Sequence, residues 1–240
     1  MRYDLQYKRY AENAILIEWP SEIDEILLQD LLFYKKSIEK YCDEVILEVI
    51  SSYNSLLILY VSTIEDFYGE VFMLKSLYVT NNSKENKNKL WRLPVCYDKK
   101  FAPDLEDFAM SKSLSVEDVI VLHTSPIYTV YFIGFLPGFL YLGGLNDKLI
   151  LPRKSTPARM VKRGSVALGG NQTGVYPMDS PGGWHVIGNC PLSFFDIKSA
   201  VPCFVSPGDK IQFISIEEKE YNEISTSVSK GFFLPDSIAI

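Results

Sequence analysis

The chain has 240 residues with 24 basic and 30 acidic side chains, which gives a formal net charge of −6 at pH 7. Hydrophobic residues make up 47% of it and aromatic residues 13%, so there is enough apolar material for a packed core. This composition excludes disordered, collagen-like and repeat proteins. At about 100 to 200 residues per domain, the length fits one large domain or two modest ones.

The opening sequence MRYDLQYKRY carries charges and lacks the apolar core of a signal peptide, so we expect a cytoplasmic protein. Residues 124–146 contain no charged side chain and approach the roughly 20 residues that a bilayer crossing requires. Pro137 and four glycines in this stretch would break a helix repeatedly, and its tyrosines suit strands. We therefore expect no membrane partner.

Glycine and proline divide the chain into two parts. Residues 1–93 hold one glycine and one proline, whereas the other 13 glycines and 12 prolines follow. The polar run NNSKENKNK at 81–89 is typical of a surface linker, so a boundary is predicted after residue 88. The domain 1–88 holds 9 basic and 15 acidic residues and the domain 89–240 holds 15 of each, which places the whole net charge in the first domain.

The first domain is predicted to contain two strand-strand-helix units. A hairpin of two alternating strands comes first, and a capping box of Ser21 and Asp24 begins a helix with one apolar face. The pattern then recurs as a second hairpin, followed by a helix that begins at Thr63 with Asp66. A two-layer α/β sandwich is the economical architecture for this pattern.

The second domain is predicted to be a β-barrel with two helices before it. Residues 91–98 fit a strand and 103–113 a helix, and a capping box of Ser115 and Asp118 begins another helix. From 127 to 216 short apolar runs alternate with Gly/Pro turns, the spacing of a closed or nearly closed barrel. The fold class is thus α+β.

Common catalytic signatures are missing: GxxxxGKS/T, GxGxxG, HExxH and GxSxG do not occur. The four cysteines are widely spaced and form no CxxC motif, which indicates reduced thiols. With only His123 and His185, and no cysteine beside either, neither a histidine metal cluster nor a Cys-His dyad is expected. His123 fits a helix-terminal histidine as well as a catalytic one.

The most informative region is 134–191, which holds 11 of the 14 glycines beside aromatic and amide side chains. Glycine lets a ligand approach main-chain N–H groups, although barrels also need glycine at their corners. From 148 to 178 there are six basic residues and no acidic one, which predicts a locally positive surface. Solvated loops are the alternative for Lys154 and Lys162, and nucleic acid is a weaker interpretation because the whole chain is acidic.

Three segments carry a family resemblance: LHTSPIYTVYFIGFLPGFLYLGGL, LPRKSTPARMVKRGSVALGGNQTGVYPMDSPGGWHVIGNCPLSFFD and VSPGDKIQF. They resemble the PxpB family of 5-oxoprolinase subunits, which also includes the sporulation-kinase inhibitor KipI and the small subunit of allophanate hydrolase. The resemblance implies an N-terminal α/β domain and a C-terminal cyclophilin-like β-barrel. The chain departs from the family at Ala158 and Met160, where relatives often carry arginine, and Arg159 is the candidate substitute for one of them.

The resemblance implies an ATP-dependent enzyme that opens the lactam of 5-oxo-L-proline to L-glutamate, with ATP and Mg²⁺ but no resident metal or organic prosthetic group. Its implied partners are the other two 5-oxoprolinase components, a PxpC protein (similar to KipA) and a PxpA protein. Two alternatives stay open at this point: a regulatory protein that inhibits a sensor histidine kinase, and an allophanate hydrolase subunit that needs an amidase partner.

Three residues are assigned catalytic roles in the implied reaction. Arg153 is expected to contact a phosphate or carboxylate, Gln172 with backbone N–H groups of 182–184 to face the oxyanion, and His123 to transfer protons. The expected substrate-binding residues are Phe135, Tyr141, Thr173, Tyr176, Gly182, Gly183 and Trp184, with Tyr176 and Trp184 as pocket walls.

Overall fold

The structure is a computed structural model that describes residues 3–20, 24–41, 44–78, 88–231 and 235–240. It divides into two compact units, Met1–Asn86 and Lys87–Ile240, and each unit has its own hydrophobic core. The predicted boundary after residue 88 lies close to this division.

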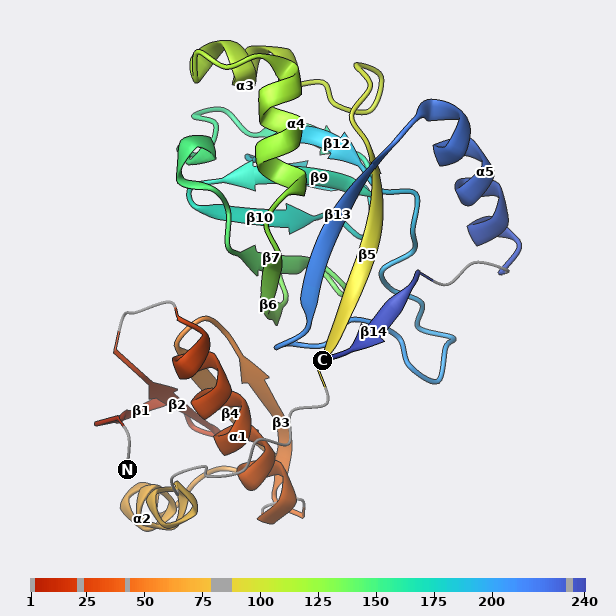
Figure 1. The fold of residues 1–240 in the computed structure, drawn as a ribbon. Coiled ribbons are helices and arrows are strands. Elements are labelled where there is room, and N and C mark those ends of the chain that lie inside the picture. The colour runs from red at the N-terminus through yellow and green to blue at the C-terminus, as the bar shows by residue number, and fades with distance from the viewer. Residues whose placement is uncertain (1–2, 21–23, 42–43, 79–87, 232–234) are drawn as a thin grey trace. The chain divides into compact units, whose positions relative to one another are not determined.

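The first unit is a two-layer α/β sandwich, as predicted (Figure 1). Its elements are β1 (Gln6–Ala11), β2 (Ala14–Glu18), α1 (Glu25–Tyr41), β3 (Ile46–Ser51), β4 (Ser55–Tyr60) and α2 (Phe67–Leu77). The antiparallel strands lie in the order β1-β2-β4-β3, and the two helices form the other layer. The apolar face of α1 is fully buried at Leu27, Leu31, Tyr34 and Ile38, so helix and sheet share one core.

Both helices of this unit begin at an aspartate. The Asp24 carboxylate accepts the backbone N–H groups of Ile26 and Leu27 at 2.7 and 2.8 Å, while Ser21 of the predicted capping box lies outside the described residues. The predicted start of the second helix at Thr63 is wrong by several residues. Asp66 is itself the N-cap of α2 and accepts the third helical N–H, so the helix begins only after it.

The second unit is a closed β-barrel with helices outside it (Figure 1). Its elements are β5 (Lys89–Cys96), α3 (Leu105–Ser111), α4 (Val116–Thr124), β6 (Tyr128–Ile133), β7 (Leu140–Gly143), the 3₁₀ helix Asp147–Leu149, β8 (Ala158–Val161), β9 (Ser165–Gly169), β10 (Gln172–Val175), β11 (Ser180–Gly182), β12 (His185–Asn189), β13 (Lys210–Ile216), α5 (Glu218–Ser229) and β14 (Ser237–Ala239). The wall follows the order β12-β9-β10-β7-β6-β13-β5, and pairing of Asn189 with Cys96 joins β12 back to β5.

The barrel confirms the predicted fold class, but it begins earlier in the chain than predicted. β5 precedes the two helices and belongs to the wall, where it runs parallel to β13. α3 and α4 are therefore an insertion between two wall strands, and they pack against β12 and β13 respectively. The predicted capping box at the start of α4 is confirmed, because Ser115 and Asp118 bond each other's backbone N–H groups.

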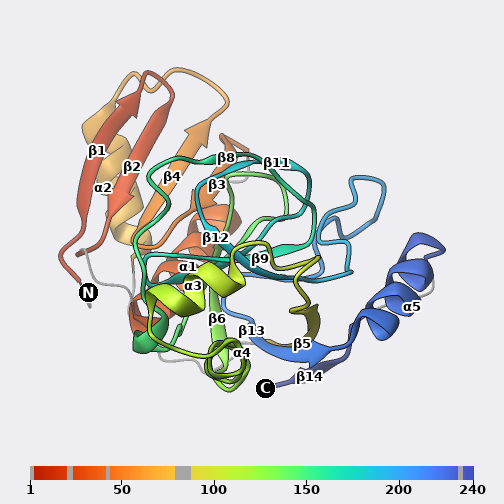
Figure 2. The same cartoon turned by 90° about the horizontal axis from the view of Figure 1, so that it is seen from above.

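The barrel wall buries side chains on both of its faces. On β9, Val166 and Leu168 point into the main core, whereas Ala167 between them belongs to a separate cluster on the outer face. The small sheet formed by β8 and β11 contributes Ala158 and Val161 to that outer cluster (Figure 2). Several residues singled out by the sequence, among them Tyr141, Tyr176 and Trp184, gather there.

Among the described residues, no helix combines the length and the apolar character needed to cross a membrane.

Because the barrel closes on itself around its own core, the fragment 87–240 should fold without the first unit. Expressed alone, it should give one cooperative thermal transition within about 5 °C of the barrel transition in the full chain, measured by circular dichroism. A fragment that lacks near-ultraviolet ellipticity and unfolds gradually would contradict this independence.

Candidate functional site

An aromatic cluster covers the outer face of the barrel wall. Phe139 lies at its centre, with its ring centroid 4.7 Å from that of Tyr141, 4.9 Å from Tyr176 and 5.8 Å from Trp184. The rings of Tyr141 and Trp184 also meet edge to face, 5.7 Å apart. Each such pair contributes about 1 kcal/mol beyond the area it buries, so the cluster forms a firm platform.

Glycines make room for these rings. A Cβ on Gly174 would lie 2.8 Å from the rings of both Phe139 and Trp184, and one on Gly169 would lie 2.6 Å from Trp184. A Cβ on Gly182 would collide with the Tyr176 hydroxyl, whereas Gly183 has its nearest neighbour at 3.7 Å. Several of these glycines thus make room for aromatic packing, while the expected ligand contacts at Gly182 and Gly183 stay predictions.

Phe135 stands at the edge of the cluster, with its ring 5.6 Å from that of Phe139. It is 64% exposed, and its backbone φ of 65° lies in the left-handed region that bulky side chains avoid. Such a conformation costs on the order of 1 kcal/mol or more, and it persists here although the ring faces solvent. This turn is therefore a candidate point of contact for a ligand or partner.

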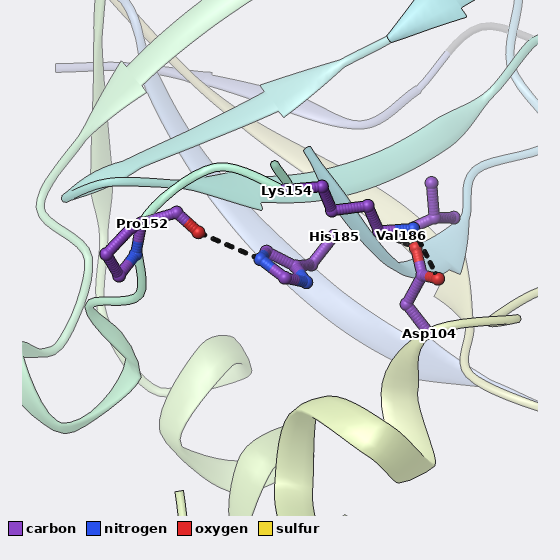
Figure 3. Close-up of polar contacts among 5 residues, drawn as sticks. All are labelled: Asp104, Pro152, Lys154, His185 and Val186. Atoms are coloured by element: carbon purple, nitrogen blue, oxygen red, sulfur yellow. Dashed lines mark hydrogen bonds and ion pairs between the residues drawn. The ribbon is translucent and has the colours of Figure 1, made fainter. Parts of the chain in front are cut away.

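Arg153 is held over Trp184 by a short antiparallel strap, residues 152–154 against 183–185. The Lys154 backbone N–H donates to the Gly183 carbonyl at 2.8 Å. His185 Nε2 donates to the Pro152 carbonyl at 2.9 Å (Figure 3). Between these two bonds the Arg153 guanidinium carbon lies 5.2 Å from the centroid of the Trp184 ring. The neighbouring residues thus hold the backbone at Arg153, while its exposed side chain lies against the ring.

A largely buried ion pair anchors the far end of the strap. Lys154 Nζ lies 2.5 Å from Asp104 Oδ1, and the Val186 backbone N–H donates to Asp104 Oδ2 at 2.7 Å (Figure 3). The expectation that Lys154 belongs to a solvated loop is therefore wrong. Lys162 does lie at the surface, where it pairs with Asp179.

The structure brings together most of the residues predicted for the site: Arg153, Phe135, Tyr141, Tyr176 and Trp184 all belong to or border the cluster. The sequence did not indicate Asp104 or the anchoring role of His185. Asp104 lies 50 residues before Lys154 and carries no motif. The one sequence feature that could have indicated His185 is its position directly after Trp184.

Gln172 and Thr173 were both assigned to the site, but neighbours in a strand face opposite ways. Gln172 lies two residues before Gly174 on β10 and therefore faces the same side of the strand, the side of the cluster. Gln172 is half-buried. Thr173 is fully buried and faces the barrel interior, where it lies close to Tyr128. Its predicted substrate contact is therefore withdrawn, because the pleat turns it away from the cluster.

His123 lies in the main core and not in the aromatic cluster. It is fully buried near the end of α4, its ring stacks on Phe213 at 4.6 Å, and its Nδ1 lies 2.7 Å from the Tyr97 hydroxyl. Burial lowers the pKa of His123 to about 3, so the imidazole is neutral at physiological pH. The predicted role in proton transfer is corrected to that of a helix-terminal core histidine.

The cluster presents one cation and two neutral phenols. Burial raises the pKa of Tyr176 to about 12 and also raises the pKa of Tyr141, while Arg153 opposes the rise at both. The Trp184 backbone also lowers the pKa of Tyr176, against the effect of burial. Within the described part of the chain, no group of three or more His, Cys, Asp or Glu side chains could hold a metal ion.

Such an arrangement suits a small planar anion. Arg153 can donate hydrogen bonds to a carboxylate or phosphate, the aromatic rings offer an apolar wall, and the half-buried Tyr141 carries a hydroxyl that can donate, whereas Tyr176 is fully buried. At neutral pH these groups can bind and orient a ligand. They are already protonated, so they cannot act as a base that removes a proton from it.

Comparison with known proteins places the chain among carboxyltransferase-like folds. The family model described as "carboxyltransferase domain, subdomain C and D" matches residues 5–205. The K. lactis urea amidolyase superposes with a TM-score of 0.82 over 99% of this chain and 16% of that protein, and its 19% identity supports the fold alone.

Two curated relatives carry the name of the 5-oxoprolinase B subunit. The protein from Bacillus subtilis is 44% identical over 138 residues, which span 58% of this chain and 58% of that protein. The protein from Haemophilus influenzae is 35% identical over 204 residues, 85% of this chain and 94% of that protein.

His123→Gln should flatten the acid dependence of stability. Because burial holds the folded-state pKa near 3, below the ordinary 6.5, the unfolded chain binds an extra proton between these values. The free energy of unfolding therefore falls as the pH drops through this window. From pH 7 to pH 5 this group should lower it by roughly 2 kcal/mol in the natural protein and not in the variant. Urea unfolding at both pH values measures the difference, and equal losses in the two proteins would contradict the buried neutral histidine.

Proposed function

This chain belongs to the PxpB family of carboxyltransferase-domain proteins, and we propose that it is one component of an enzyme that hydrolyses 5-oxo-L-proline to L-glutamate with hydrolysis of ATP to ADP and phosphate. The observation that carries the proposal is Arg153, fixed over Trp184 beside two uncharged phenols. The substrate is a flat ring that bears a carboxylate, which matches a cation above an apolar wall.

The chemistry explains why ATP and cations are required. An unstrained lactam is a poor electrophile, and transfer of the γ-phosphoryl group to its oxygen activates the carbonyl carbon. Water adds to that carbon, the C–N bond breaks to leave an acyl phosphate, and a second water releases phosphate and L-glutamate. Negative charge gathers on phosphate and oxyanion in these steps, so fixed cations and hydrogen-bond donors stabilise them.

The residues of this chain are assigned to binding and orientation. Arg153 contacts the carboxylate or a phosphate oxygen, and Gln172 with the Gly183 backbone N–H faces the oxyanion. Trp184 and Tyr141 form the walls. Mg²⁺ would arrive with the nucleotide, because the described residues offer no cluster of metal ligands.

Proton transfer is assigned to a partner protein. The phenols of the cluster stay protonated at neutral pH and His123 lies in the core, so the described part of the cluster supplies no base to activate water. This supports a site completed by the 5-oxoprolinase component PxpC, with PxpA needed for the full reaction.

Arg153→Gln should reduce kcat/KM of the assembled enzyme by about 100-fold or more, since it removes a fixed charge from the transition state. Arg153→Lys should recover only part of this, because an ammonium lacks the planar fork. Glutamate released from 5-oxo-L-proline and ATP is the measurement. Arg92→Gln changes an exposed arginine elsewhere in the barrel and should leave the rate unchanged. A parallel loss of thermal stability in Arg153→Gln would instead identify a structural residue.

The chain alone should release no glutamate, and it should bind PxpC through residues 87–240. Titration calorimetry of PxpC with the full chain and with this fragment should give the same dissociation constant within about threefold. Turnover by the isolated chain, or binding that requires residues 1–86, would contradict the shared site.

The two alternative functions are tested in the same preparations. Allophanate hydrolysis predicts ammonia release from allophanate when an amidase partner is present. If the chain is a kinase inhibitor, the chain alone should reduce the autophosphorylation of a sensor histidine kinase. This effect should not require 5-oxo-L-proline, and no ATP-dependent glutamate release should be seen.

A further inference from the structure

A groove adjoins the aromatic cluster. It has a volume of about 510 Å³ and lies between β8, the turn before β9, β12 and α5. Trp184 and Lys154 line it, so the groove is continuous with the strap that carries Arg153. The volume lies within the range of about 300–1,000 Å³ that small-molecule sites occupy.

The lining of the groove is rich in cations. Lys100, Lys154, Lys162 and Arg163 line it, and Asp104 is the one carboxylate among the described lining residues, although Glu218 and Asp179 pair with Lys100 and Lys162 from outside the lining. This excess is local, because the chain as a whole carries a net charge of −6. The charge favours an anionic occupant.

Lys154 and Asp104 form the fixed part of the lining. Their side chains are 24% and 21% exposed, and Asp104 also accepts the Val186 backbone N–H (Figure 3). A buried, hydrogen-bonded pair of this kind is costly to break, so it is expected to remain intact when a ligand binds.

The other cations are able to take new partners. Lys100 pairs with Glu218 and Lys162 with Asp179, and all four side chains are at least 44% exposed. Such surface pairs stabilise by about 0–1 kcal/mol, so anionic oxygens can replace the carboxylates at little cost. Arg163 has no ion-pair partner within the described part of the chain. Its guanidinium can bind two oxygens of one phosphate.

A pair of aromatic rings, tilted by 39° to each other, lies at the α5 side of the groove, and Lys100 Nζ lies 5.1 Å from the centroid of the Phe101 ring. The rings of Phe101 and Tyr221 are 4.2 Å apart, and both are half-buried. The Tyr221 hydroxyl donates to Asn189 Oδ1 at 2.8 Å, which fixes its ring. A base stacked on such a surface gains about 1–3 kcal/mol.

We propose that this groove binds a nucleotide, with its phosphates on Arg163, Lys100 and Lys162 and its base against the Phe101–Tyr221 pair. The inference rests on the proposed function, since an ATP-dependent reaction needs a nucleotide site and no phosphate-loop motif marks one. Trp184 borders both the groove and the strap, so the proposed nucleotide site adjoins the residues assigned to the lactam.

Calorimetric titration of the full chain with ATP, without Mg²⁺ and at low salt, tests the site. Arg163→Gln should weaken ATP binding by about tenfold or more, as loss of a bidentate phosphate contact implies. Lys100→Gln, an independent change from a different segment, should weaken it by about threefold. Arg92→Gln should have no effect. The backbone groups of Arg163, not its side chain, bond Asp179 and Asn189, so Arg163→Gln should keep its thermal transition.

Tripolyphosphate in a second titration separates a nucleotide site from a simple phosphate site. It should bind more weakly than ATP, and Phe101→Ala should remove that difference while leaving tripolyphosphate binding unchanged. Equal affinities of the natural protein for the two ligands, or equal ATP affinities of Arg163→Gln and Arg92→Gln, would overturn the assignment. Failure of the proposed function would give a different result from failure of the nucleotide site. If only the function is wrong, the isolated chain would bind ATP through Arg163 but the assembled enzyme would release no glutamate.

Discussion

The side chain of Trp184 connects every part of the candidate site. Its indole fills space that Gly169 on β9 and Gly174 on β10 leave open, and it supports Arg153 on its ring. A β-carbon at either glycine would displace the indole, so the strands of the barrel and not only the loops determine where it lies. Because barrel closure fixes the pairing of those strands, the position of the cation depends on the whole domain.

The cluster that forms around this indole is suited to binding but not to acid–base catalysis. Burial keeps its phenols neutral, and the carboxylate closest to the strap, Asp104, is fully engaged by Lys154 and a backbone N–H. Activation of water requires a group that can accept a proton near neutral pH. Among the described residues the cluster offers binding groups and no such base, which supports the proposal of a site shared between proteins; the relatives are named as subunits.

The barrel and most of the cluster could be predicted because they depend on local patterns: alternating strands, Gly/Pro turns and a concentration of glycine beside aromatic residues. The errors arose where a motif does not say which face a residue occupies. Thr173 follows Gln172 directly yet lies inside the barrel, and His123 stacks on Phe213 from a distant strand. Asp104 could not be found from sequence, because only the tertiary fold brings it to Lys154.

The same reasoning changes the meaning of the basic stretch between 148 and 178. Acidic residues from outside the stretch neutralise two of its lysines, Lys154 and Lys162. Arg153 and Arg163 keep no ion-pair partner among the described residues; one lies over the Trp184 ring, and the other lines the groove that this ring borders. Lys148 and Arg159 of the stretch also have no ion pair among the described residues, but Arg153 and Arg163 are the two that adjoin the cluster or the groove, and their separation favours two anionic groups over one. The proposed reaction brings a carboxylate-bearing lactam to a phosphate donor and would supply such a pair. Charge pairing is therefore a better guide to this surface than the count of basic residues.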